Sequence, residues 1–298
     1  MIKIHYPPAV HRETREYLLI KQGLVNNPRV ELVDNEPESD FVFQFYYVNR
    51  ESREFPPVLS PPEKTVIIDY HDKPRWFFPF KNYLAYFKRS WTEMEVKENY
   101  TIRKPCPKPE KVYPITFAIM DEFIVEEDLE RDVDLSCTFR PVKHRGHINR
   151  ERVLNMLKLA QLPGVLQLGS YTKGSMKRFN APDMREYFRL LKRSRIVVTC
   201  NPGRWDGDHR TWEALANGAL VFVDETSFPL RHPFIDGKHL IYYEPSDQGL
   251  MELWKQVRFF MEPINHNHAR EIAMNGHKFA MKYHRTANRI DEILEVIT

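Results

Sequence analysis

The segment from Ser194 to Phe234 decides the fold of this chain and reads SRIVVTCNPGRWDGDHRTWEALANGALVFVDETSFPLRHPF. An apolar run at Ile196–Thr199 predicts a strand, and the loop Asn201–Asp208 follows it, rich in glycine and aspartate. The spacing then predicts a helix over Arg210–Asn217 and a second strand over Ala219–Val223. Strand, loop, helix and strand in this order indicate a βαβ unit of a parallel sheet.

The same alternation continues on both sides of this segment. Further strands are predicted at Ile2–Tyr6, Val30–Val33, Asp40–Val48, Thr65–Tyr70, Leu84–Arg89, Ile115–Ile119, Leu135–Phe139, Val165–Gly169 and Leu240–Tyr243. Helices are predicted at Arg12–Gln22, Asn149–Leu162, Ala181–Arg193, Asp247–Met261 and Ala269–Val296. We therefore expect an α/β protein of two Rossmann-like lobes, residues 1–125 and 126–265, with a helix in 266–298 that returns to the first lobe.

Composition narrows the class of protein. The chain carries 44 Lys and Arg against 41 Asp and Glu, a net charge of +3 with no long basic run, which speaks against a nucleic-acid partner. Its three cysteines are widely spaced and form neither a disulfide framework nor a metal-ligand pattern, so we expect a reducing compartment. Because no apolar run approaches the roughly 18 residues of a membrane span, we expect a soluble, cytoplasmic protein.

The loop before the helix at Arg210 predicts a phosphate site. A helix reached from a glycine-containing loop presents N–H groups and a positive dipole end to an anion. His209 and Arg210 add side-chain donors there, and Glu213, one turn further on, is suited to accept hydrogen bonds from ribose hydroxyls. In open α/β sheets, ligands bind at the carboxyl ends of the strands, which is where this loop lies.

These residues resemble the signature of the exostosin-like (GT47-type) glycosyltransferases. In that family a strand ending in Pro-x-Gly leads to an Arg, to Glu-Ala, to a small-residue turn and to a strand ending near Asp. The matching residues are Pro202, Gly203, Arg210, Glu213, Ala214, Gly218, Ala219, Val221, Asp224 and Pro233-Phe234. A second similarity covers Thr138–Pro141, His144–Gly146 and Arg150. Asn217 and Leu220 depart from the family's turn.

The resemblance implies a GT-B fold, a UDP-sugar donor held by the second lobe, and transfer to a glycan or glycoprotein acceptor with inversion at the anomeric carbon. By the same resemblance, Arg140, Arg145 and Arg210 approach the diphosphate and Glu213 holds the ribose. Pro202, Gly203 and Asp224 complete the expected donor site. Xylose, glucuronic acid and galactose donors occur in the family, and we favour xylose. A viral or bacterial member acting on cytosolic glycans fits a chain without a membrane anchor.

Inverting transfer needs a base to take the proton of the acceptor hydroxyl. In the first lobe, the apolar strand at Val66 runs into Asp69, His71 and Asp72. Side chains at a strand's carboxyl end can face a cleft, so Asp72 is our first candidate, His71 the second and Asp69 the third. His11, after the first strand, is a further candidate.

Other interpretations stay open. Asp206-Gly207-Asp208 and Asp132-Val133-Asp134 both spell the Asp-x-Asp of metal-dependent transferases. We expect no metal or other cofactor, because the first motif lies in the phosphate loop and the second simply precedes a strand. Arg210 also suits an ion pair on the helix surface, and Asp224 a turn cap. A non-catalytic nucleotide- or sugar-binding module is the alternative to an enzyme.

Overall fold

The computed structural model describes residues 1–9, 13–46, 61–71, 82–90, 96–98, 101–103, 110–139, 148–159, 162, 182–201, 207–226 and 228–298. The chain folds into two compact units. The first contains Met1–Ala118, Ser227–Leu230 and His284–Thr298, and the second contains Ile119–Thr226 and Arg231–Tyr283. Each unit is built on its own parallel sheet.

The first unit contains a six-stranded sheet in the order β2-β1-β3-β4-β5-β8, with every neighbouring pair parallel. Its strands are β1 (Ile2–His5), β2 (Val30–Val33), β3 (Phe41–Tyr46), β4 (Thr65–Asp69), β5 (Ala85–Lys88) and β8 (Val112–Pro114), and η1 (Pro62–Lys64) leads into β4. β4 is buried along its whole length, as expected of a central strand covered on both faces. Two short strands, β6 (Val96–Glu98) and β7 (Thr101–Arg103), pair antiparallel as a separate sheet.

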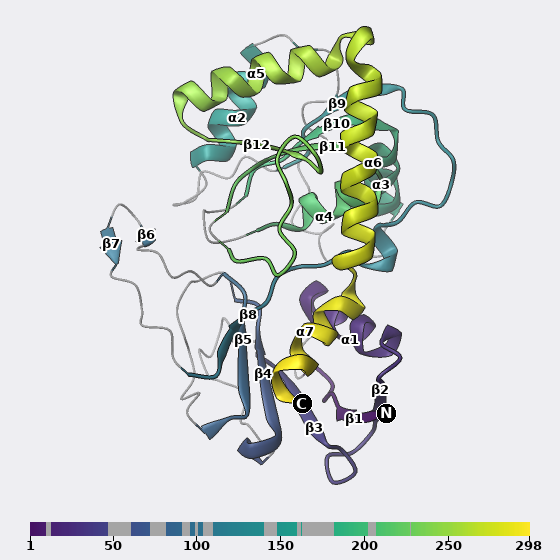
Figure 1. Ribbon diagram of the computed structural model, residues 1–298, viewed down its shortest axis with the longest axis vertical. Helices are drawn as coiled ribbons and strands as arrows, with labels where there is room; N and C mark the ends of the chain where they lie inside the picture. Colours follow the sequence, from purple (N-terminus) through teal and green to yellow (C-terminus); the bar gives the residue numbers. More distant parts are fainter. Residues whose placement is uncertain are drawn as a thin grey trace. The chain divides into compact units, whose positions relative to one another are not determined.

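Helices α1 (Arg15–Asn26) and α7 (Thr286–Ile297) pack against each other in the first unit (Figure 1). Thr14 caps α1 by accepting a hydrogen bond from the Tyr17 N–H (3.2 Å). The helices approach so closely at Gly23 that a Cβ there would lie 2.6 Å from the Thr286 carbonyl oxygen. The Asn27 amide then donates to the Ala287 carbonyl at 3.2 Å. The last helix of the chain is therefore part of the first unit.

One strand lies earlier in the chain than the sequence predicts. Residues 115–118 form no strand, and β8 at Val112–Pro114 pairs with β5 instead. The apolar run from Ile115 to Met120 is nevertheless buried. Its hydrophobicity therefore reflects burial of an extended segment and not membership of the sheet.

The second unit contains a four-stranded sheet in the order β12-β11-β10-β9, again with parallel neighbours. The strands are β9 (Val133–Ser136), β10 (Ser194–Val198), β11 (Leu220–Asp224) and β12 (Ile241–Tyr243). The helices are α2 (Ile148–Leu159), α3 (Pro182–Arg193), α4 (His209–Ala216), α5 (Asp247–Met261) and α6 (His266–Tyr283), with short turns at η3 (Asp121–Phe123) and η5 (Pro263–Asn265). The strand predicted at Val165–Gly169 lies outside the described residues.

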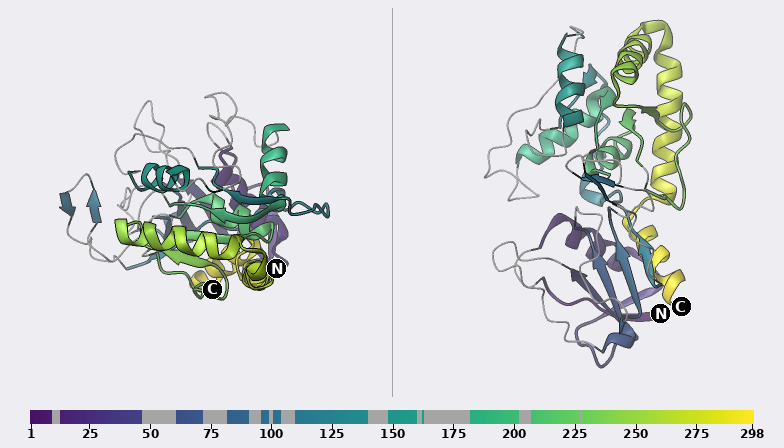
Figure 2. Two further views of the ribbon diagram at one scale, coloured as in Figure 1. Left: turned by 90° about the horizontal axis from the view of Figure 1, so that it is seen from above. Right: turned by 90° about the vertical axis from the view of Figure 1, so that its left-hand side faces the viewer.

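Helices cover both faces of this second sheet (Figure 2). Alternate strand residues, such as Ile196, Val198 and Phe222, join one core cluster with the buried side chains of α2 and α5. α3 contacts β9 and β10, and α4 contacts α3, α6 and β11. The side chains of α3 and α4 do not belong to that core cluster. The unit is a doubly wound α/β layer structure, whose strands end together at one edge.

Two helices occupy the stretch for which the sequence predicts the single helix Ala269–Val296. α6 belongs to the second unit and α7 to the first, with His284 and Arg285 between them. The Arg285 N–H donates to the Asn288 side chain (2.8 Å), which gives α7 its own start. Periodicity alone does not reveal this break, because both helices carry an apolar face.

Candidate functional site

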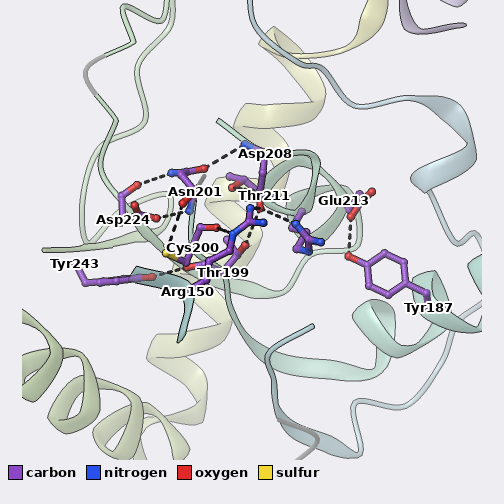
Figure 3. Close-up of polar contacts among 11 residues, drawn as sticks. Arg150, Tyr187, Thr199, Cys200, Asn201, Asp208, Thr211, Glu213, Asp224 and Tyr243 are labelled. Atoms are coloured by element: carbon purple, nitrogen blue, oxygen red, sulfur yellow. Dashed lines mark hydrogen bonds and ion pairs between the residues drawn. The ribbon is translucent and has the colours of Figure 1, made fainter. Parts of the chain in front are cut away.

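The candidate site lies where β10 and β11 end and α4 begins (Figure 3). Asp208 is the N-cap of α4, and its Oδ1 accepts a hydrogen bond from the Thr211 N–H at 3.2 Å. An aspartate is favoured at this position because it satisfies an N–H group that has no partner within the helix. The predicted phosphate loop therefore does lead into a capped helix.

Two arginines converge on the Asp208 carboxylate. Arg150 Nη2, from α2, lies 3.2 Å from Asp208 Oδ2, and Arg210 Nη1, from α4, lies 3.0 Å from the same oxygen. The Thr199 hydroxyl also donates to Oδ2 (3.3 Å), and Arg150 Nε donates to the Cys200 carbonyl (2.9 Å). The Asp208 carboxylate thus binds two guanidinium groups at the start of α4.

The two arginines differ in their access to a ligand. The Arg150 side chain is 8% exposed, whereas that of Arg210 is 23% exposed. Burial lowers the pKa of Arg150, while Asp208 acts in the opposite direction. For Arg210, burial alone would lower the pKa, but Asp208, Tyr187 and Glu213 together outweigh it and raise the pKa above its ordinary value. Arg210 is therefore positively charged, and part of its side chain is exposed and can contact an anion.

Asn201 joins the end of β11 to the start of α4. Its N–H donates to Asp224 Oδ1 (2.6 Å) and its amide donates to the Asp224 carbonyl (2.7 Å). Its side-chain oxygen accepts from the Asp208 N–H (3.2 Å). Burial, only partly offset by the hydrogen bond from Asn201, raises the pKa of Asp224 to about 7. Asp224 therefore braces the loop and titrates near neutral pH.

Glu213 is buried on α4 and accepts a hydrogen bond from the Tyr187 hydroxyl at 2.6 Å. Tyr187 comes from α3, so two helices fix this carboxylate. Burial raises the pKa of Tyr187 well above its ordinary value, and Glu213 adds to the effect. The tyrosine therefore stays protonated and acts as a donor to Glu213.

Two of the first-lobe candidates, Asp69 and His71, lie at the carboxyl end of β4. Asp69 is fully buried, pairs with Lys88 Nζ at 3.4 Å, and accepts hydrogen bonds from the Tyr86 hydroxyl and the His71 N–H. His71 is half-buried. Asp72, the first candidate from the sequence, and His11 lie outside the described residues.

Several predicted donor-site residues also lie outside the described part of the chain. These are Arg140, Arg145, Pro202 and Gly203, and Asp206 of the alternative metal motif lies outside it as well. The described candidates Arg210, Glu213 and Asp224 all belong to the α4 and β11 region.

Three residues of the site were not among the sequence candidates for it: Arg150, Tyr187 and Asn201. An Asn after a strand and an Asp before a helix are local signals of the kind that mark loop braces and caps. Arg150 belongs to the second similarity with the exostosin-like family. Its contact with Asp208, like that of Tyr187 with Glu213, joins distant helices and is not revealed by a local pattern.

No group of three or more His, Cys, Asp or Glu side chains suited to a metal occurs among the described residues. The same residues contain no helix long and apolar enough to cross a membrane. Cys137 and Cys200 are buried, and burial raises the pKa of both thiols.

The second half of the chain is similar to a known protein family. Residues 150–295 match a family described as glycosyl transferase-like. The match begins at Arg150 and includes α4, Glu213 and Asp224. A comparison with curated protein sequences gives no match.

Solved structures with the same fold are glycosyltransferases. A glycosyltransferase from Rickettsia africae aligns with a TM-score of 0.54 at 10% identity, over 99% of this chain and 97% of its own. HepE from Anabaena, solved with UDP-glucose, gives 0.56 at 12% identity, over 100% and 99%. An α1,3-fucosyltransferase solved with GDP gives 0.52 at 11% identity, over 99% and 88%. The fold is therefore GT-B, as the resemblance implied.

Proposed function

We propose that this protein transfers a glycosyl group from a UDP-sugar to a hydroxyl of a glycan acceptor. One observation carries the proposal most directly. Arg210, held by Asp208 at the amino end of α4, lies in the part of the chain that matches the glycosyl transferase-like family, with the buried Glu213 on the same helix. A fixed cation and a helix N-terminus suit a diphosphate, and a positioned carboxylate suits ribose hydroxyls.

The proposed reaction is an inverting displacement. An acceptor oxygen attacks the anomeric carbon, the bond from that carbon to the diphosphate oxygen breaks, and UDP leaves with the electron pair. A base at His71 or Asp72 takes the acceptor proton. Arg210, with the helix dipole, stabilises the charge that develops on the diphosphate, with Arg140 and Arg145 as further proposed donors of positive charge.

We further propose that the transfer needs no metal ion. The Asp208 carboxylate already binds two guanidinium groups, Arg150 and Arg210, and their positive charges disfavour a divalent cation beside it. Exostosin-like specificity, with xylose as the first sugar to test and a glycan or glycoprotein as the acceptor, is part of the same proposal.

Thermal shift with nucleotides tests the donor site. UDP should raise the melting temperature more than ADP does, because a ligand that binds only the folded state stabilises it. Glu213→Ala should remove most of the preference for UDP. Glu186→Ala, at an exposed glutamate of α3, is the matched control and should keep it. Equal stabilisation by both nucleotides in the parent and in Glu213→Ala would exclude this site.

Turnover tests the chemistry. UDP release from UDP-xylose, UDP-glucuronic acid and UDP-galactose should be measured with a panel of glycan acceptors, and NMR of the product should show an inverted anomeric centre. Binding of UDP without transfer from any of these donors would favour the non-catalytic binding module.

A further inference from the structure

A buried ion pair in the first unit holds both backbone polar groups of His71. The His71 N–H donates to Asp69 Oδ1 at 2.7 Å, and the His71 carbonyl accepts from Lys88 Nζ at 2.6 Å. Lys88 Nζ also lies 3.4 Å from Asp69 Oδ1, and neither side chain is exposed. The residue that follows β4 by two positions is therefore fixed by side chains of two strands.

The strand register explains how the pair forms. Asp69 is the last residue of β4 and Lys88 the last of β5, and the two lie opposite each other in the parallel pairing. The Tyr86 hydroxyl, also from β5, donates to the second oxygen of Asp69. Both oxygens of this carboxylate thus have partners inside the unit.

Stability alone is a poor reason for such a pair. Taking two charges out of water costs several kcal/mol per ion, and a well-packed apolar pair of similar volume is often as stable or more so. Preceding residues of the same strands, such as Ile67, Ile68 and Ala85, are apolar and buried. The polar pair differs from them in what it binds, which is the backbone of His71.

We propose that Asp69 and Lys88 are positioning residues for glycosyl transfer, which fix the His71 backbone at the carboxyl end of β4. This inference rests on the proposed function, in which His71 or Asp72 is the base. A base must be placed within hydrogen-bond reach of the proton it removes, and a displacement of about 1 Å can cost about 100-fold in rate. Asp69 then acts through His71, and its carboxylate does not contact the acceptor.

Two double variants isolate the hydrogen bond to the His71 carbonyl. Asp69→Asn with Lys88→Met and Asp69→Asn with Lys88→Gln both remove the buried charges, so neither leaves an unpaired ion. Asn at 69 retains an oxygen for the His71 N–H. Gln at 88 offers an N–H to the His71 carbonyl, whereas Met offers none. The two variants therefore differ in whether residue 88 can donate a hydrogen bond to the His71 carbonyl.

We expect the Met variant to lose about tenfold or more in kcat, with the KM for the UDP-sugar and the Kd for UDP unchanged. The Gln variant should recover most of the lost kcat. Lys64→Met is the control, because Lys64 lies just before the opposite end of β4 and donates to the Glu36 carbonyl (2.8 Å). It should keep the parental kcat.

Equal kcat in the two double variants would overturn the inference, and so would a parallel loss of UDP affinity. Failure of both variants to fold would assign the pair to stability and overturn it as well. Variants His71→Ala and Asp72→Asn distinguish a failure of the proposed base from a failure of the positioning role. If both transfer at the parental rate, the proposed base is wrong and the inference falls with it. If either loses turnover while the Met variant does not, only the positioning role is refuted.

Discussion

The buried carboxylate of Asp224 makes the stability of the protein depend on pH. Burial raises its pKa from 3.8 to about 7. Between those values the folded state holds a proton that the unfolded state has released. The free energy of unfolding therefore falls as pH rises through this window, by at most about 1.4 kcal/mol per pH unit, and levels off above pH 7.

The first prediction replaces this carboxyl by an amide. Asp224→Asn keeps an oxygen for the Asn201 N–H but does not titrate, so its unfolding free energy should depend less on pH between 4 and 7 than that of the parent. Urea unfolding at several pH values measures the difference. Asp134→Asn, at a half-exposed surface ion pair with Arg195, serves as the control. An unchanged slope in Asp224→Asn would show that another group titrates in this window.

The second prediction concerns the charge of Asp208. Asp208→Asn keeps an N-cap acceptor but leaves Arg150 and Arg210 without their shared counter-ion. Breaking a buried pair on one side costs about 3–5 kcal/mol, so we expect a clear fall in melting temperature and weaker stabilisation by UDP. Asp132→Asn removes an exposed pair with Arg193 and should change little.

Chelation tests whether Asp208 serves as a partner of two arginines or as a metal ligand. Transfer by the parent should survive EDTA, because the positive charge comes from guanidinium groups and a helix dipole. Loss of transfer in EDTA with recovery in Mn²⁺ would instead make Asp206 and Asp208 metal ligands.

At the scale of elements, periodicity and caps identify most of the structure. β2 and α5 lie at the residues that the sequence predicts, and β10, β11 and α4 lie within a few residues of theirs. The differences have a physical cause. The run from Ile115 is apolar because it is buried, although residues 115–118 form no strand. The break at His284 depends on which unit each helix packs against.

Some residues of the site can be predicted from the sequence, and others cannot. Arg210, Glu213 and Asp224 emerge from the sequence because they belong to one strand, loop, helix and strand segment. Arg150 is 58 residues from Asp208 in the chain, and the pairing depends on how α2 packs on the sheet. Tyr187 lies on the apolar face of α3, where an aromatic side chain looks like a core residue. Contacts between residues so far apart in the sequence can be predicted only when the fold is known.

The third prediction tests the contact between α1 and α7. Gly→Ala within a helix ordinarily stabilises by about 0.5–1 kcal/mol. At Gly23 the sign should reverse, because the new Cβ would lie 2.6 Å from the Thr286 carbonyl oxygen. Urea unfolding should show Gly23→Ala to be less stable than the parent, while Val25→Ala, at an exposed position of the same helix, should change little. A more stable Gly23→Ala would mean that the helices do not pack in this way.

At the scale of the whole molecule, the chain divides into two cores that can be perturbed separately. Ile290 is fully buried on α7 in the first unit, and Leu253 is fully buried on α5 in the second. Substituting either by Ala should cost about 2–5 kcal/mol through the lost burial and the cavity left behind. Each variant should therefore loosen one unit in particular.

The fourth prediction uses this pair of variants to locate nucleotide binding. Hydrogen exchange should show faster exchange in β10, β11 and α5 for Leu253→Ala, and in β1, β4 and α7 for Ile290→Ala. Because Arg210 and Glu213 belong to the second unit, UDP should slow the accelerated exchange in Leu253→Ala. In Ile290→Ala the exchange of α7 should respond less to UDP. If UDP protected α7 in Ile290→Ala as strongly as it protects β11 in Leu253→Ala, nucleotide binding would depend on the first unit, and the assignment of the donor site to the second unit alone would be wrong.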